Sequence, residues 1–176
     1  EGVEDYRKAT ELDPASLVIA SDYGLAYYYM RQYDHSIEVL KKAIEMDPNF
    51  VRTHYYLVSP YLKKGMTDEA FRELINGMVA DGDSATTIDG VKQAYAAAGF
   101  KGVAAFQLAH PERFSAYDNM RLSIRAGDRD KALTYLEQAF EHRDNFCVLM
   151  KVDPTMDDLR SEPRFIALMK KMGFDK

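Results

Sequence analysis

The tetrapeptides Glu11-Leu-Asp-Pro14 and Glu45-Met-Asp-Pro48 are near copies of each other, and they lie about 34 residues apart. Each Asp-Pro pair marks the end of a helix, because the residue before a proline disfavours the helical conformation. Between the two copies, apolar residues recur three or four positions apart, as they do along one face of a helix. Two helices are expected there, over residues 17–31 and 34–46. The sequence therefore predicts an all-α protein in which a pair of helices is the repeating unit.

The first expected helix of this pair carries Gly24 and Tyr27, and the second carries Leu40 and Ala43 before Pro48. Two helices can cross closely only where one side chain is small, and a neighbouring aromatic ring fills the remaining gap. This arrangement resembles the tetratricopeptide repeat (TPR). The resemblance implies an α-α superhelix of TPR-like helix pairs with a C-terminal capping helix, and a role in binding other proteins.

Weaker copies of the pair follow along the chain. Ala70 and Leu74 keep the repeat spacing in a second copy, and Leu136 and Ala139 keep it in a third. Between these two copies, Gly99 is expected to end one helix of an irregular pair. We expect a single array over residues 1–176, with a partial repeat at 1–14, repeats at 15–49, 50–84 and 113–145, an irregular helix pair at 85–112 and a capping segment at 146–176.

The last third of the chain carries several short motifs: Gly127-Asp128 with Lys131-Ala-Leu133, Lys151-Val-Asp-Pro154, Leu159-Arg160 and Pro163-Arg-Phe165. These motifs resemble the end of helical-repeat regions at the C-terminus of bacterial signalling proteins, such as winged-helix transcription regulators, protein kinases and adenylate cyclases. The resemblance implies a bacterial signalling or regulatory parent protein.

The net charge and the length of the apolar runs argue against two classes of partner, nucleic acids and membranes. The formal net charge of −5 argues against nucleic-acid binding, because phosphate recognition depends on an excess of Lys and Arg. No apolar run approaches the ~20 residues of a membrane span, so we expect no membrane association and favour a cytoplasmic location. The sequence begins at Glu1 rather than Met, which we interpret as a mature end or as the cut end of a longer protein.

The side chains that usually carry chemistry form no recognisable site. Cys147 is the only cysteine and is flanked by Phe146 and Val148, so we expect a buried structural thiol. The histidines, at positions 35, 54, 110 and 142, lack the spacing of a helical metal pair and are expected in turns or on the surface. We therefore expect no catalytic residue, no metal ion and no cofactor, and we predict that the chain is not an enzyme.

The candidate binding site follows from the repeat register, because the first helices of such an array line its concave surface. The candidate peptide-binding groove consists of Val18, Ser21, Leu25, Tyr28, Tyr29, Arg52, Tyr55, Ser59, Leu62 and Lys63. Tyrosine is a frequent interface anchor, since it combines a large ring with a polar tip. Tyr27 is expected to take part in helix packing, whereas for Tyr28 and Tyr29 packing and groove are equally favoured. The expected partner is a protein or peptide segment, extended or helical.

Several alternatives stay open. Chaperone-binding TPR proteins clamp the terminal carboxylate of a peptide with Lys and Asn, but Ser21 and Leu25 replace the expected polar residues here, which argues against that ligand class. Pro60 falls inside an expected helix and either kinks it or is a tolerated change in a weak repeat. Two other functions remain: self-association into a homo-dimer, and small-molecule sensing through an apolar pocket in residues 85–112.

Overall fold

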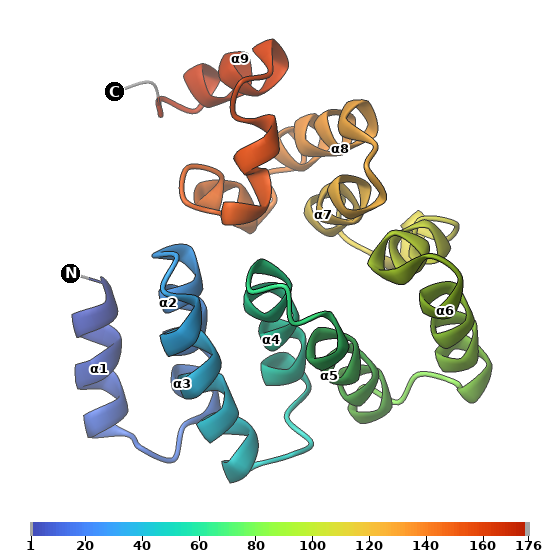
Figure 1. Ribbon diagram of the computed structural model, residues 1–176. Coiled ribbons are helices and arrows are strands. Elements are labelled where there is room, and N and C mark those ends of the chain that lie inside the picture. Colours follow the sequence, from blue (N-terminus) through green and yellow to red (C-terminus); the bar gives the residue numbers. More distant parts are fainter. Residues whose placement is uncertain (1, 175–176) are drawn as a thin grey trace. The chain divides into compact units, whose positions relative to one another are not determined.

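The computed structural model describes residues 2–174, and over that range it contains α-helices and 3-10 helices without a β-strand (Figure 1). The prediction of an all-α fold is therefore confirmed. The elements are α1 (Gly2–Leu12), α2 (Leu17–Tyr29), α3 (Tyr33–Met46), α4 (Val51–Lys63), α5 (Thr67–Ala80), α6 (Ala85–Gln107), η1 (Pro111–Arg113), α7 (Ala116–Ala126), α8 (Arg129–Glu141), η2 (Asn145–Leu149), η3 (Pro154–Leu159) and α9 (Pro163–Lys171).

The contacts within the chain divide it into two compact units, with the boundary between Ile88 and Asp89. Unit 1 contains α1 to α5 and the start of α6. Unit 2 contains the rest of α6, then α7 to α9 and the 3-10 helices.

In unit 1, α2 pairs with α3 and α4 pairs with α5, while α1 packs on α2 (Figure 1). The two first helices, α2 and α4, also contact each other. Gly24 is needed where α2 crosses α3, because a Cβ atom at this position would lie 2.5 Å from Leu40 Cγ. The packing predicted from the Gly24 and Leu40 spacing is thus present. Both Asp-Pro pairs directly follow a helix, as predicted.

In each helix pair, one residue of the turn between the two helices has a left-handed backbone conformation, with a positive φ. Arg31, Gly65 and Gly127 occupy this position, with φ of 61°, 73° and 84°. In α7, for example, Gly127 is the C-cap, and its N–H donates to the carbonyl of Ile124. Glycine adopts this conformation without the steric cost that a side chain brings. The first pair is the exception, since it tolerates an arginine there.

The irregular middle of the chain is a helical hairpin. The element α6 spans Ala85 to Gln107, but Ala98 and Gly99 have non-helical dihedral angles and divide it into two helical limbs. Gly99 has φ 58°, so it ends the first limb as predicted. A Cβ atom at Gly102 would lie 2.2 Å from the carbonyl oxygen of Ala94, which shows how closely the backbone folds back on itself.

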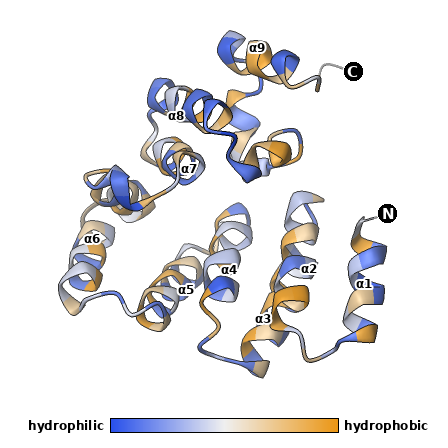
Figure 2. Ribbon diagram, turned by 180° about the vertical axis from the view of Figure 1, so that it is seen from behind, coloured by the Kyte–Doolittle hydropathy of each residue, from blue (hydrophilic) through white to orange (hydrophobic). Residues whose placement is uncertain are grey.

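Unit 2 is organised around the α7–α8 pair, with η3 against α7 and α9 against α8. Figure 2 shows hydrophobic residues interleaved with hydrophilic ones along α8 and α9. Apolar residues of α7, α8, α9 and the segments around η2 and η3 meet in one buried cluster, which includes Tyr117, Met120, Leu136, Met150, Met156 and Phe165. The C-terminal segment therefore covers the apolar side of the α7–α8 pair, as expected of a capping segment.

Candidate functional site

The predicted groove residues lie on α2 and α4 of unit 1, the two helices that pack side by side. They differ in how much of each side chain solvent can reach. Exposed are Val18, Arg52 and Lys63; half-buried are Leu25, Tyr29, Tyr55 and Leu62; buried are Ser21, Tyr28 and Ser59. Seven of the ten residues therefore offer surface to a ligand.

The buried members of the set have structural roles. The Ser21 hydroxyl of α2 lies 2.7 Å from the hydroxyl of Thr53 on α4, so the pair joins the two helices by a buried hydrogen bond. Tyr28 is 1% exposed, and its ring lies 5.9 Å from that of Tyr33. The alternative of packing is the better description of Tyr28, whereas Tyr29 is half-buried.

An ion pair also links α2 and α4. Arg52 Nη1 on α4 lies 3.5 Å from Asp22 Oδ1 on α2. Burial raises the pKa of the Asp22 carboxyl above its ordinary value, and the positive charge of Arg52 opposes this effect. Since both side chains keep solvent contact, this pair contributes to the charge pattern of the surface more than to stability.

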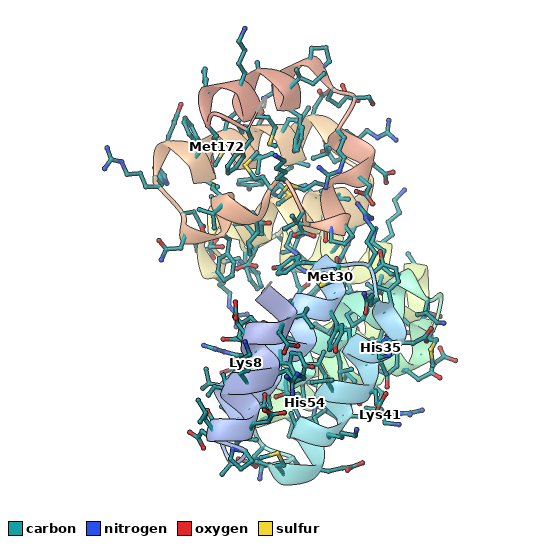
Figure 3. All side chains as sticks on the ribbon, turned by 90° about the vertical axis from the view of Figure 1, so that its left-hand side faces the viewer. Lys8, Met30, His35, Lys41, His54 and Met172 are labelled. Atoms are coloured by element: carbon teal, nitrogen blue, oxygen red, sulfur yellow. The ribbon has the colours of Figure 1, made fainter. Side chains whose placement is uncertain are left out.

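His54 was expected in a turn or on the surface, and the structure places it in the interior. It is 3% exposed and lies among the helices of unit 1, whereas Lys8 and Lys41 lie at the outside (Figure 3). Its Nδ1 is 2.6 Å from Glu73 Oε2 on α5, and its Nε2 is 2.8 Å from the carbonyl oxygen of Pro48. His54 thus ties α4 to α5 and to the preceding turn.

The burial of His54 could have been predicted from the spacing of the repeats. His54 lies at the position equivalent to Ala20, about 34 residues earlier, and Ala20 is also buried. The same register, applied to the second copy, would have placed His54 in the core.

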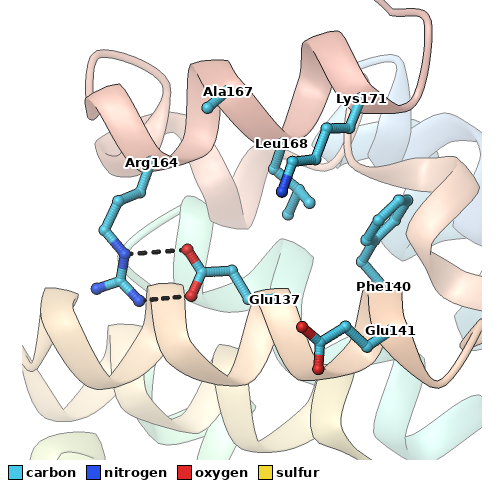
Figure 4. A pocket seen from close by; sticks show the side chains of 7 residues that line it. All are labelled: Glu137, Phe140, Glu141, Arg164, Ala167, Leu168 and Lys171. Atoms are coloured by element: carbon cyan, nitrogen blue, oxygen red, sulfur yellow. Dashed lines mark hydrogen bonds and ion pairs between the residues drawn. The ribbon is translucent and has the colours of Figure 1, made fainter.

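A shallow hollow of about 380 Å³ lies between α8 and α9 in unit 2, lined by Glu137, Phe140, Glu141, Arg164, Ala167, Leu168 and Lys171 (Figure 4). The guanidinium group of Arg164 donates two hydrogen bonds to Glu137, at 3.0 and 2.7 Å. This interaction lowers the pKa of the Glu137 carboxyl. Two of the four charged groups that line the hollow therefore bind each other and hold α9 on α8.

The C-terminal motifs of the sequence also have structural roles. Asp153 is fully buried: its carboxylate accepts a hydrogen bond of 2.9 Å from the Tyr117 hydroxyl and one of 2.8 Å from the N–H of Thr155. Arg160 donates to the Asp153 carbonyl at 3.1 Å. The aspartate thereby caps η3 and holds it on α7.

Cys147 is buried, as predicted, and burial together with the charge of Asp144 raises the pKa of its thiol to about 11. Among the described residues, His, Cys, Asp and Glu side chains form no group of three that could hold a metal ion. None of the helices in the described range is both long enough and apolar enough to cross a bilayer.

Comparison with known proteins supports the repeat. Residues 24–70, from the middle of α2 to the start of α5, match the family model described as TPR repeat. Over 49 residues the chain is 41% identical to Hsp70-Hsp90 organizing protein 2 of Arabidopsis thaliana; this stretch is 28% of the chain and 9% of that protein. Proteins with such repeats act in protein–protein interaction, which agrees with the predicted role. The bacterial signalling context stays a prediction.

Proposed function

We propose that this chain is a protein–protein interaction scaffold and that it binds a peptide or protein segment along α2 and α4. The observation that carries the proposal is the contact between these two first helices, which brings the half-buried and exposed groove residues of both onto one unit. A binding surface needs apolar side chains that are held in place but not consumed by the core, and these residues meet that condition.

The chemistry of the surface suggests its ligand. Leu25, Tyr29, Tyr55 and Leu62 offer apolar area, and Arg52 and Lys63 add positive charge at the exposed positions. A segment with apolar residues next to acidic ones fits this combination, because apolar contacts give affinity and complementary charges give specificity and speed of association. The relative in Arabidopsis is, by its name, an organiser of Hsp70 and Hsp90. For the present chain we propose an internal apolar and acidic segment rather than a terminal carboxylate.

Three finer points belong to the same proposal. The parent is a bacterial signalling or regulatory protein, on the strength of the C-terminal motifs. Its location is cytoplasmic. The segments with boundaries at residues 14, 49, 84, 112 and 145 are the repeats and caps of one interaction module.

The test is selection of peptides from a random display library by the immobilised chain. Selected peptides should share apolar residues flanked by Asp or Glu. Tyr29→Ala together with Lys63→Glu should weaken their binding at least about tenfold, in line with the loss of one interface anchor. Lys41→Glu, on the outer helix α3, is the matched charge control and should bind as the unaltered chain does. Equal binding by the groove variant would refute the proposal.

A further inference from the structure

Asp22 lies on the face of α2 that carries the groove residues. Residues that are three or four positions apart share one face of a helix. On α2 such a series consists of Val18, Asp22, Leu25 and Tyr29. The other three are exposed or half-buried members of the candidate groove, and Asp22 is half-buried as well. Ser21, the predicted groove residue next to it, is buried. At this level of α2, Asp22 is therefore the residue that a ligand in the groove would meet.

The carboxylate of Asp22 has room for further hydrogen bonds. A carboxylate can accept about four. Within the described residues its side-chain partner is Arg52, whose Nη1 lies 3.5 Å from Oδ1, at the long limit of a hydrogen bond. Burial raises the pKa of the Asp22 carboxyl more than the charge of Arg52 lowers it. The negative charge of Asp22 is thus incompletely balanced within the protein.

Arg52 also keeps donors for a ligand. A guanidinium group carries five N–H donors, and the contact to Asp22 uses one of them. The Arg52 side chain is 45% exposed and the Asp22 side chain is 29% exposed, so a ligand can reach both. The groove therefore offers a carboxylate that accepts hydrogen bonds beside a guanidinium group that donates them.

We propose that Asp22 binds a basic side chain, Lys or Arg, of the peptide segment, next to the acidic side chain that binds Arg52. This inference rests on the proposed function, because it assigns a second charged residue to the same ligand. A cation at Asp22 supplies the balancing charge that Arg52 alone does not supply, through charge-assisted hydrogen bonds. A purely acidic segment would bring a second negative charge against Asp22, so this residue makes the groove select against such segments.

The contact between Asp22 and Arg52 determines the spacing of the two charges in the ligand. Because the two side chains touch, the basic and acidic groups of the ligand must reach neighbouring points of the groove. In an extended segment, residues two positions apart point to the same side and lie roughly 6–7 Å apart. In a helical segment, residues three or four positions apart have Cβ atoms about 5–6 Å apart. The expected ligand carries Lys or Arg at one of these spacings from Asp or Glu, beside apolar residues.

Parallel selections from one random peptide library test this motif. The unaltered chain and the Asp22→Asn variant are immobilised, and the bound peptides are sequenced. Asparagine has nearly the shape of aspartate, so the substitution removes the charge and keeps the form of the groove. We expect peptides selected by the unaltered chain to carry the basic residue at the stated spacing. Peptides selected by Asp22→Asn should keep the apolar and acidic residues and lose the enrichment of Lys and Arg.

Titration calorimetry with one selected peptide measures the effect. The peptide is acetylated and amidated, so its charges come from side chains alone, and a second peptide carries Gln in place of the Lys or Arg. On the unaltered chain the basic residue should tighten binding about fivefold, the upper end for a partly exposed ion pair. On Asp22→Asn the two peptides should differ by less than about twofold, because the partner charge is gone.

Glu38→Gln is the matched control. It removes one negative charge, as Asp22→Asn does, and it breaks a surface ion pair of 2.7 Å with Lys42 on α3. The net charge of the protein therefore changes equally in both variants. Glu38→Gln should keep the preference for the basic peptide. Loss of this preference in Glu38→Gln as well would assign the effect to net charge and overturn the role of Asp22.

The other outcomes separate this inference from the proposed function. Selected peptides that lack the basic residue would overturn the role of Asp22 and leave groove binding in place. A basic residue whose effect persists undiminished in Asp22→Asn would do the same. Failure to select any peptide would refute the proposed function, and the role of Asp22 with it.

Discussion

Replacement of His54 by leucine removes a buried side chain that holds three segments of unit 1 together. His54 bridges Glu73 on α5 and the carbonyl oxygen of Pro48, and it is 3% exposed. Leucine fills a similar volume but donates no hydrogen bond. The substitution therefore separates the polar contribution of this residue from its contribution to packing.

The loss can be assigned a magnitude from the contacts. Each of the two hydrogen bonds contributes about 1 kcal/mol, and a mostly buried polar group that loses its partner adds a cost of about 1–3 kcal/mol. The Glu73 side chain is 16% exposed, so water reaches part of it and the lower end applies. We expect His54→Leu to lower the free energy of unfolding by about 3 kcal/mol, a large share of the roughly 5–15 kcal/mol that is typical of a domain.

Urea unfolding followed by circular dichroism measures this change, and a double-mutant cycle tests its cause. Glu73→Leu in the His54→Leu background removes the orphaned carboxylate and should recover at least about 1 kcal/mol relative to His54→Leu alone. A loss below about 1 kcal/mol for His54→Leu would refute the reasoning. Simple additivity of the two substitutions would show that the pair is not coupled.

Three further changes test the packing. Gly24→Ala should destabilise the protein by about 1–2 kcal/mol in urea unfolding despite the better helix propensity of alanine, because the new Cβ meets the buried Leu40. Gly127→Ala should cost about 1 kcal/mol in the same assay through its positive φ alone, since no atom lies within 4 Å of the place that its Cβ would take. Cys147 should react slowly with a thiol reagent below its pKa of about 11 and quickly in urea. Because folding raises this pKa, its contribution to stability is complete below the ordinary value of 9.0 and falls as the pH rises toward 11.

The repeat was predictable because its signals are local and periodic. The Asp-Pro pairs at residues 13–14 and 47–48 each follow the end of a helix, so the helix expected at residues 34–46 is found at Tyr33–Met46. The contact between Gly24 and Leu40 follows from the need for a small residue at a helix crossing. Cys147 is buried as predicted, although the flanking Phe146 and Val148 are themselves exposed. None of these inferences required knowledge of which distant segments meet.

The orientation of the groove residues was not predictable in the same way. Tyr27, Tyr28 and Tyr29 follow one another, and consecutive residues point to different sides of a helix. The residues of α2 are apolar on most sides, so no polar face indicates which ring turns inward. The hydrogen-bond partners of His54 could not be predicted from the local sequence pattern either. Glu73 lies on another helix, and a carboxylate at that position resembles any other exposed charge until the register of the second copy is applied.

The interior polar contacts bear on binding as well as on stability. Ser21 and Thr53 join α2 to α4 by a buried hydrogen bond, and His54 joins α4 to α5. These contacts hold α2, α4 and α5 at defined distances from one another in the absence of a ligand. A peptide that binds along α2 and α4 then orders few side chains of the scaffold, so less of its interaction free energy is lost to conformational entropy. Substitutions at Ser21 should therefore weaken peptide binding without touching the peptide.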